Sequence, residues 1–177
     1  MPIYLQGQSW VDNMLLGIIA DTHNDIDSFE KALAIFRERG IKTLVHAGDI
    51  TSPRMLEYLV EFDCYIVLGN GDQIDKDVIN WKASVLGLRP VEDTIEFEFG
   101  GKSFMVFHGN NVPLYRQAVA SGKYNYIIKG DTHYFENYVS NECRIINPGA
   151  VYRHDESSIV ILDVEADKVE KIDLDEN

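Results

Sequence analysis

Seven side chains able to bind a metal ion stand in short motifs spread along the chain. They are Asp21, His23, Asp49, Asn70, His108, Asp131 and His133. Carboxylate oxygens, imidazole nitrogens and an amide oxygen together suit divalent ions of borderline character, such as Mn, Fe, Zn or Co. Four of the motifs contain a glycine, which permits a positive φ and close approach of the backbone. The residue types therefore indicate a metal centre, although each motif alone is common enough to arise by chance.

Three buried strands are predicted ahead of the first motifs. Leu15–Ala20 is a continuous apolar run, typical of a strand buried on both faces, and Thr43–Ala47 and Cys64–Leu68 repeat the strand pattern. Asp21 and His23 follow the first run, Asp49 the second and Asn70 the third. The carboxyl ends of parallel strands meet at one edge of a sheet, where ligands of α/β proteins bind. We therefore expect these side chains to converge.

Two helices are predicted between these strands. Asp27 could cap the first helix, with Glu30 three positions later and Gly40 just beyond its end. Ser52 and Pro53 suit the start of the second helix. Its inward face would consist of Met55, Leu56, Leu59 and Val60. The resulting βαβαβ order requires parallel strands joined by right-handed crossovers.

The second half of the chain has a different pattern. Thr94–Phe99 and Lys102–His108 flank Gly100-Gly101 and indicate a hairpin, and a helix is predicted from Asn111 to about Ser121. Further strands are predicted over Tyr126–Gly130, Glu136–Val139, Cys143–Ile146, Ser157–Asp163 and Val169–Asp173. About ten strands are too many for one small sheet. We predict an α/β fold of two packed mixed β-sheets flanked by helices, a four-layer α-β-β-α sandwich formed by residues 14–177 as a single domain. Residues 1–13 would be an N-terminal extension of uncertain role.

Composition narrows the range of partners. Sixteen Lys and Arg against 29 Asp and Glu give a net charge of −13, so no nucleic acid partner is expected. No apolar run reaches the roughly 20 residues of a membrane span. Cys64 and Cys143 lack CxxC spacing, and two cysteines are too few to cross-link a domain of this size. We therefore expect free thiols, as in a reducing cytoplasm. The excess of acidic residues could keep the protein soluble or could bind cations. A homo-oligomer is also possible on the sequence alone.

The series of motifs resembles one known family. Asp21-x-His23, Gly48-Asp49, Gly69-Asn70-x-Asp72, His108-Gly109 and Gly130-Asp131-Thr132-His133, in this order, resemble the calcineurin-like metallophosphoesterase superfamily, in particular its small single-domain phosphodiesterase branch. The resemblance extends from about Leu15 to Leu174 and includes Asn147-Pro148-Gly149. It implies a phosphodiesterase that hydrolyses small phosphate esters through a hydroxide activated by two divalent ions.

The resemblance also implies a role for each motif residue. The first ion would be bound by Asp21, His23, Asp49 and His133. The second would be bound by Asp49 as a bridge, Asn70, His108 and the residue at position 131. Asp49, Asn70 and His108 would be the catalytic residues. Mn is the first choice of metal, with Ni, Fe, Co, Zn or Mg as alternatives, and the substrate would be a small phosphodiester.

Two positions depart from the family pattern. The branch usually has Gly-His-Thr-His where this chain has Asp131. Asp131 could be a hard ligand that favours Mn or Mg and makes bound water less acidic, or a shorter side chain that leaves the second ion short of a ligand; we favour a ligand. Gly71 stands where larger members have a histidine thought to protonate the leaving group. Good leaving groups should therefore be preferred, unless the substrate or another side chain supplies the proton.

The remaining candidates are expected to be structural. His46 should be a buried support for the Asp49 loop, Asp72 should orient the Asn70 loop, and His154 should lie in an exposed turn. The alternative function is a metal-poor scaffold or binding module, because the retromer complex contains a subunit of this fold with a decayed metal site. Six of seven matching ligands favour the enzyme over the scaffold.

Overall fold

The first of two sheets contains the strands predicted at the start of the chain. In the computed structural model, which describes residues 14–152 and 156–175, this sheet has five strands in the order β10-β9-β1-β2-β3. β1, β2 and β3 are parallel, and β9 and β10 are antiparallel to their neighbours. The strands are β1 (Leu15–Ile19), β2 (Thr43–His46), β3 (Asp63–Ile66), β9 (Ser158–Asp163) and β10 (Lys168–Asp173).

The second sheet also has five strands, in the order β4-β5-β6-β8-β7. β5, β6 and β8 are parallel, whereas the edge strands β4 and β7 pair antiparallel with them. The strands are β4 (Thr94–Phe99), β5 (Lys102–Phe107), β6 (Tyr126–Ile128), β7 (Phe135–Ser140) and β8 (Cys143–Pro148). The predicted pair of mixed sheets is therefore confirmed.

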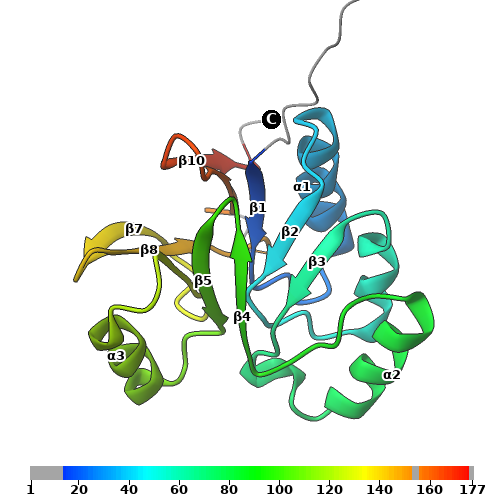
Figure 1. Cartoon of the computed structure of the whole chain (residues 1–177). Coiled ribbons are helices and arrows are strands. Elements are labelled where there is room, and N and C mark those ends of the chain that lie inside the picture. The colour runs from blue at the N-terminus through cyan, green and yellow to red at the C-terminus, as the bar shows by residue number, and fades with distance from the viewer. Residues whose placement is uncertain (1–13, 153–155, 176–177) are drawn as a thin grey trace, which may run out of the picture.

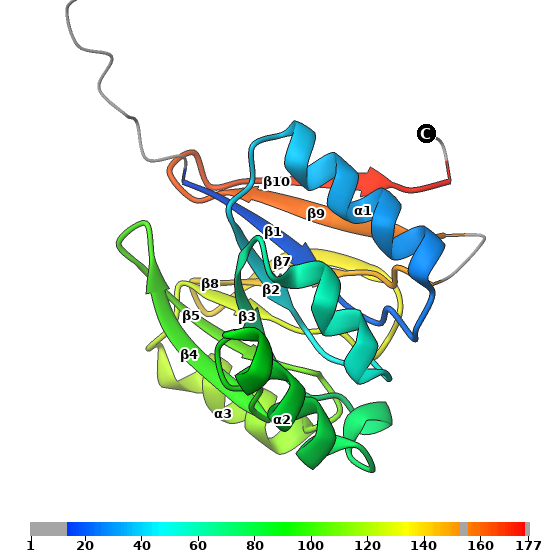
Figure 2. The same cartoon turned by 90° about the vertical axis from the view of Figure 1, so that its right-hand side faces the viewer.

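The two sheets lie face to face with helices on their outer sides (Figures 1 and 2), and three apolar cores fill the spaces between these layers. Side chains such as Leu16, Val45 and Phe104 fill the space between the two sheets. The outer face of the first sheet packs against α1 (Ile26–Glu38), the 3₁₀ helix η1 (Pro53–Leu59) and α2 (Lys76–Leu86). The outer face of the second sheet packs against α3 (Val112–Ser121). This is the predicted four-layer sandwich, and residues on alternate faces of each strand supply two cores at once.

Local differences from the predictions concern the helices. The cap of α1 is Asp25, whose carboxylate accepts from the Ser28 N–H at 3.1 Å, and Asp27 lies in the first turn instead. Ser52 and Pro53 begin a 3₁₀ helix, and Ser52 makes no side-chain cap. Val60 was predicted to face inward but is 53% exposed. The helix ends at Leu59, which is buried as predicted, and Val60 follows it as the C-cap, so the inward face does not continue to that residue.

The helix α2 was not predicted at all. Its inward side chains are few, since Ile79 and Ala83 are its buried residues, whereas Trp81 and Val85 are more than 60% exposed. Apolar residues on both sides obscure the helical period that normally identifies such a segment.

No helix in the described part of the chain is long and apolar enough to cross a membrane. The predicted N-terminal extension, residues 1–13, and the predicted turn at His154 lie outside the described residues.

Candidate metal centre

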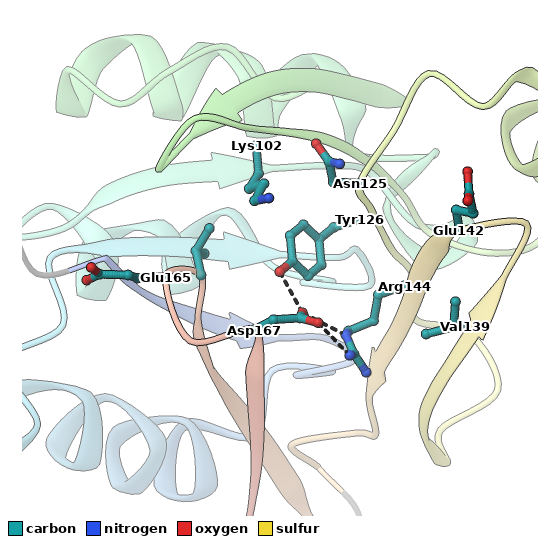
Figure 3. A pocket seen from close by; sticks show the side chains of 9 residues that line it. Lys102, Asn125, Tyr126, Val139, Glu142, Arg144, Glu165 and Asp167 are labelled. Atoms are coloured by element: carbon teal, nitrogen blue, oxygen red, sulfur yellow. Dashed lines mark hydrogen bonds and ion pairs between the residues drawn. The ribbon is translucent and has the colours of Figure 1, made fainter.

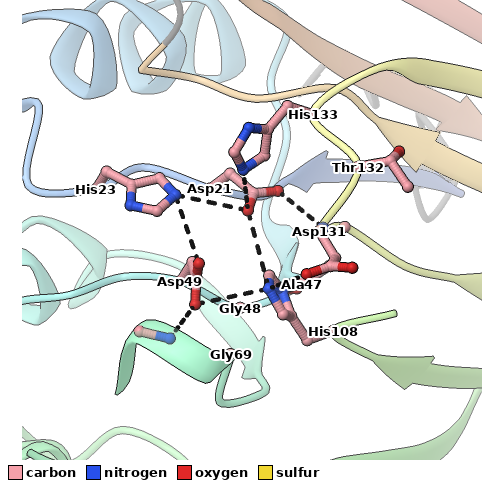
Figure 4. Close-up of polar contacts among 12 residues, drawn as sticks. Asp21, His23, Ala47, Gly48, Asp49, Gly69, His108, Asp131, Thr132 and His133 are labelled. Carbon is pink, nitrogen blue, oxygen red and sulfur yellow. Dashed lines mark hydrogen bonds and ion pairs between the residues drawn. The ribbon is translucent and has the colours of Figure 1, made fainter. Parts of the chain in front are cut away.

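Loops from both sheets meet at the carboxyl ends of the parallel strands (Figure 4). β1, β2 and β3 lead into the loops of the first sheet, and β5 and β6 into those of the second. Six of the seven predicted ligands come within 4.0 Å of another member of the group through their side-chain atoms: Asp21, His23, Asp49, His108, Asp131 and His133.

One half of this cluster is centred on Asp21. Its Oδ1 lies 3.3 Å from His133 Nε2 and 3.7 Å from His23 Nε2. The His23 Nε2 atom is also 3.5 Å from Asp49 Oδ2. The neighbouring Asp21 carboxylate raises the pKa of His23. Asp21, His23 and His133 together form a group able to hold a metal ion.

The other half is centred on His108. Its Nε2 lies 3.6 Å from Asp49 Oδ1, 3.5 Å from Asp131 Oδ1 and 4.0 Å from Asp21 Oδ1. Asp21, Asp49 and His108, all buried, form a second group able to hold an ion. The two oxygens of Asp49 thus face different halves, Oδ2 toward His23 and Oδ1 toward His108.

Three buried polar atoms in this cluster have no hydrogen-bond partner among the described residues: Asp21 Oδ1, His23 Nε2 and His108 Nε2. Leaving such an atom unsatisfied costs about 1–3 kcal/mol, and more when the group is charged. His108 is 2% exposed, and its Nδ1 lies 2.9 Å from the Ala47 carbonyl oxygen. A carbonyl only accepts, so Nδ1 donates to it, and Nε2 is left facing the carboxylates of Asp21, Asp49 and Asp131. A bound cation resolves this arrangement, so the donor set fits divalent metal ions.

The backbone of the cluster adopts an uncommon conformation. Positive φ angles occur at Asp21 (52°), His23 (43°), Asp49 (55°), Asp131 (72°) and His133 (62°). This region costs on the order of 1 kcal/mol for residues other than glycine, although Asp, Asn and His tolerate it better than most. Strain of this kind concentrates where the fold must aim side chains at a functional site.

Asn70 is the predicted ligand that the described contacts do not include. Its side chain is exposed, and it begins the short 3₁₀ helix η2 (Asn70–Asp72). Its neighbours hold the loop against Asp49: the Gly71 N–H donates to Asp49 Oδ1 at 2.7 Å, and a Cβ on Gly69 would lie 2.0 Å from that oxygen. The loop therefore reaches the centre because position 69 has no side chain.

Asp72 connects the loop of Asn70, which follows β3, to the loop after β2. It is fully buried, and its carboxylate accepts from the N–H groups of Gly69 (2.7 Å), Thr51 (2.7 Å) and Ile50 (3.3 Å). Burial raises the pKa of Asp72, while these three bonds favour its charged form. Asp72 occupies the supporting position expected from the sequence.

His46 lies beneath the centre and connects two loops. The Gly48 N–H donates to His46 Nδ1 at 3.3 Å, so Nε2 holds the hydrogen and donates to Thr22 Oγ1 at 3.1 Å. Burial lowers the pKa of His46 to about 3, which keeps the ring neutral. Thr22 stands between Asp21 and His23, and Gly48 precedes Asp49, so His46 helps to fix the two loops that carry these three ligands.

Two further residues contact the cluster. Asn147 Nδ2 donates to the Gly130 carbonyl at 2.9 Å and to Thr132 Oγ1 at 3.0 Å, which holds the loop of Asp131 and His133. The Asn-Pro-Gly motif pointed to this residue. Tyr152, which the sequence analysis missed, has its hydroxyl 3.2 Å from His133 Nδ1. No local pattern identifies it, because its role depends on contacts with distant segments.

A cavity of about 300 Å³ lies at the opposite ends of the strands (Figure 3). There the Tyr126 hydroxyl donates to Asp167 at 2.7 Å, and Arg144 forms a two-point ion pair with the same carboxylate at 2.9 and 2.7 Å. Burial raises the pKa of Tyr126. Tyr126, Arg144 and Asp167 therefore satisfy one another without a bound ion.

Comparisons with known proteins agree with this geometry. A family model described as the calcineurin-like phosphoesterase superfamily domain matches residues 14–167. The chain belongs to this superfamily. The family resemblance and the prediction of an enzyme, a phosphoesterase, are thereby confirmed.

Individual relatives give the same result. A phosphodiesterase of Methanocaldococcus jannaschii is 28% identical over 166 residues, which cover 92% of this chain and all of that protein. The structure of an archaeal phosphodiesterase superposes with a TM-score of 0.80 at 27% identity, covering 90% of this chain and 99% of the other. Vacuolar Protein Sorting 29 of Cryptosporidium parvum, at 18% identity and a TM-score of 0.63 over 89% of this chain and 95% of its own, shares the fold.

Proposed function

We propose that this chain is a phosphodiesterase that binds two divalent metal ions and hydrolyses small phosphate esters. The observation that carries the proposal is the set of buried atoms without partners, Asp21 Oδ1, His23 Nε2 and His108 Nε2. Imidazole nitrogens and carboxylate oxygens face one another there at 3.3–4.0 Å, and a divalent cation would suit all of them. The activity in the name of the archaeal relative supports the choice of a diester.

Each ion would have its own set of ligands. Asp21, His23, His133 and Asp49 Oδ2 would hold the first ion, and Asp49 Oδ1, His108 and Asp131 the second, with Asn70 completing that shell. Asp131 adds a hard oxygen where the family has an imidazole, so we propose Mn first, with Ni, Fe, Co, Zn or Mg as alternatives. When bound, such ions lower the pKa of water and neutralise phosphoryl charge.

The residues of the chain have two tasks in this function. The first task is to hold the ligand atoms in place before any ion binds. Ala47 does this for His108 through Nδ1. His46 does it for the loops of Asp21 and Asp49 through its bonds with Thr22 and Gly48. A cavity of about 470 Å³ adjoins the centre at His133 and is lined by Tyr134, Phe135 and Lys171 together with the carboxylates of Glu156, Asp173 and Asp175. We propose that it takes the uncharged organic part of the ester. This volume suits a small organic group.

Two further proposals concern the cell compartment of the protein and its assembly. Cys64 and Cys143 are both buried free thiols, which supports the predicted reducing cytoplasm. A homo-oligomer stays a prediction that gel filtration with light scattering can test.

Metal analysis coupled to one assay tests the function. Purified protein is stripped with a chelator, reloaded with Mn²⁺ and assayed with bis(4-nitrophenyl) phosphate. We expect two ions per chain and hydrolysis that disappears with chelator and returns with Mn²⁺. Asp167→Asn, which changes a carboxylate at the opposite end of the strands, is the matched control and should behave like the parent. A chain that holds less than one ion after reloading and hydrolyses nothing would instead support the scaffold alternative.

A further inference from the structure

Four apolar side chains form an exposed stripe along α2. They are Ile74, Val78, Trp81 and Val85, each between 50% and 96% exposed. Their spacing of four, three and four residues places them on one side of a helix, with Ile74 in the turn just before α2. Ile79 and Ala83, which fix α2 to the core, lie on the other side. We call these four exposed residues the α2 stripe.

Apolar residues at these positions favour neither the helix nor its contact with water. Val and Ile are β-branched and form helices less well than Lys, Glu or Ala, so an exposed helix face gains nothing from them. Single exposed apolar residues are ordinary, but four at helical spacing make a continuous patch, and such patches mark contact surfaces. α2 lies at the edge of the molecule (Figure 1), where another chain can reach the stripe.

A second copy of this chain matches the stripe when the two α2 helices run antiparallel. A two-fold axis between residues 79 and 80 places Ile74 opposite Val85 of the second copy, and Val78 opposite Trp81 of the second copy. Every residue of the stripe then meets an apolar residue, and the largest side chain faces a small one. A parallel pair would instead place Trp81 against Trp81 and align the two helix dipoles, which is less favourable.

The flanks of the stripe carry complementary charges in the antiparallel arrangement. Asp75 and Lys82 lie on the same flank of α2, and the two-fold axis brings Asp75 of each copy beside Lys82 of the other. On the opposite flank Asp77 meets Ser84, so no like charges face each other. Lys82 is held in this position by an ion pair with Glu57 of its own chain. Polar residues thus surround the apolar stripe, as in many interfaces between proteins.

We propose that the α2 stripe is the interface of a homodimer in which two α2 helices pack antiparallel. The proposal gives the predicted homo-oligomer a surface, and it does not depend on bound metal ions. α2 has 11 residues and is about 16 Å long, so the pair buries less than the roughly 800 Å² per partner of a standard interface. We therefore expect a Kd in the micromolar range.

Sedimentation equilibrium of the metal-free protein tests this surface. The parent is measured from about 1 to about 200 µM, which brackets a micromolar Kd, at about 0.15 M salt to screen the repulsion between chains of net charge −13. We expect a dimer of twice 20.1 kDa at the upper end. Trp81→Glu should raise the Kd at least about thirtyfold, because a central tryptophan carries much of the affinity of an interface. Val85→Glu should also raise the Kd.

Val139→Glu is the matched control. Val139 is 59% exposed on β7 of the other sheet, against 63% for Val85, so the same substitution there should leave the Kd unchanged. Circular dichroism checks that each variant keeps its fold. A parent that stays monomeric throughout would overturn the proposal. A parent dimer that Trp81→Glu and Val85→Glu leave intact would keep the homo-oligomer and overturn this interface. Neither outcome depends on whether the protein hydrolyses diesters.

Cysteine cross-linking tests the antiparallel arrangement. Ile74→Cys and Val85→Cys proteins are mixed and oxidised, and the native Cys64 and Cys143 are buried. Position 74 of one copy faces position 85 of the other, so mass spectrometry should find the mixed disulfide. The two positions 74 lie about 16 Å apart in this arrangement, too far for a disulfide, so Ile74→Cys alone should not cross-link. Self-linked products without the mixed disulfide would indicate a parallel pair and overturn the proposal.

Discussion

Two polar clusters lie at opposite ends of the parallel strands. In one the polar groups are paired with one another, and in the other several buried polar atoms lack a partner. At the amino ends, Arg144, Tyr126 and Asp167 satisfy one another through hydrogen bonds of 2.7–2.9 Å. At the carboxyl ends, Asp21, His23 and His108 bring together buried atoms that have no partners among the described residues. The cavity at the satisfied end is well formed, with a volume of about 300 Å³. A cavity with charged walls is therefore weaker evidence for a site than a buried donor set whose members cannot satisfy one another.

The comparison also shows how the fold supports an arrangement that is unfavourable on its own. The positive φ angles of five proposed ligands and the three unpartnered atoms would each destabilise the metal-free protein. They are held by groups behind them: His46 beneath Thr22, Asp72 beneath Thr51, and Ala47 behind His108. Four predictions follow this contrast between the two ends.

The largest effect is expected at Asp49, whose two oxygens face the two halves of the centre. Asp49→Asn should bind fewer than two Mn²⁺ ions and lose activity on the order of 10³-fold, because one shared charge is removed from both ions. Asp167→Asn makes the same chemical change at the other end and should leave metal content and rate unchanged. Elemental analysis and diester hydrolysis check both variants. If Asp49→Asn matched the parent in metal content and rate, the carboxyl-end cluster would not be the metal centre.

The pH dependence of stability should distinguish the buried group beneath the centre. The pKa of His46 is about 3 in the folded protein, against about 6.5 when unfolded. Below pH 6.5 only the unfolded chain takes up this proton, so the free energy of unfolding should fall by about 1.4 kcal/mol per pH unit toward pH 3.

The variant His46→Gln should reduce this slope, as measured by urea unfolding of metal-free protein between pH 7 and pH 4. Tyr126→Phe is the control from the opposite end. The pKa of Tyr126 is raised above its usual value near 10, so this residue stays neutral over the whole range. Identical slopes for the parent and His46→Gln would show that folding does not lower the pKa of His46.

A smaller effect is expected at Asp131, the position that departs from the family. Its Oδ1 lies 3.5 Å from His108 Nε2, and its side chain is 36% exposed. Asp131→Ala should weaken binding of the second ion about tenfold, or about 1.4 kcal/mol. Asp131→His should be at least as active as the parent at saturating Mn²⁺, because removing a negative charge makes bound water more acidic. Calorimetric titration with Mn²⁺ gives the affinities, and Asp131→Ala binding two ions as tightly as the parent would show that Asp131 is not a ligand.

The smallest effect should occur at the satisfied cluster. Asp167 is 54% exposed in its ion pair with Arg144, and exposed pairs contribute about 0.2–1 kcal/mol. Asp167→Asn should therefore lower the free energy of unfolding by less than about 1 kcal/mol. Chemical unfolding at low and high salt measures this change, and a loss of several kcal/mol would mean that the amino-end cluster is more important for the fold than its exposure indicates.

Much of the framework can be predicted from local sequence. β1 is visible as a continuous apolar run, and the apolar centres of β2 and β3 repeat it, because strands covered on both faces need mostly apolar residues. The second half could be divided into strands in the same way, through alternation and the turn at Gly100-Gly101. Segments with weak or mixed patterns were misjudged, as at Val60 and in α2, because their faces are set by neighbours rather than by the segment itself.

The candidate site also has features that the sequence predicts and features that only the tertiary structure shows. Residue types and their positions after strands were sufficient to nominate Asp21, His23, Asp49 and His108, since the end of a parallel strand fixes where the next residues must be. Only the tertiary structure decided that Asn70 stays exposed, that one oxygen of Asp49 faces each half, and that Tyr152 lies behind His133. These features depend on distances of a few ångströms between loops far apart in the chain. Local sequence specifies conformation over a few residues, whereas the packing of two sheets fixes which distant atoms meet.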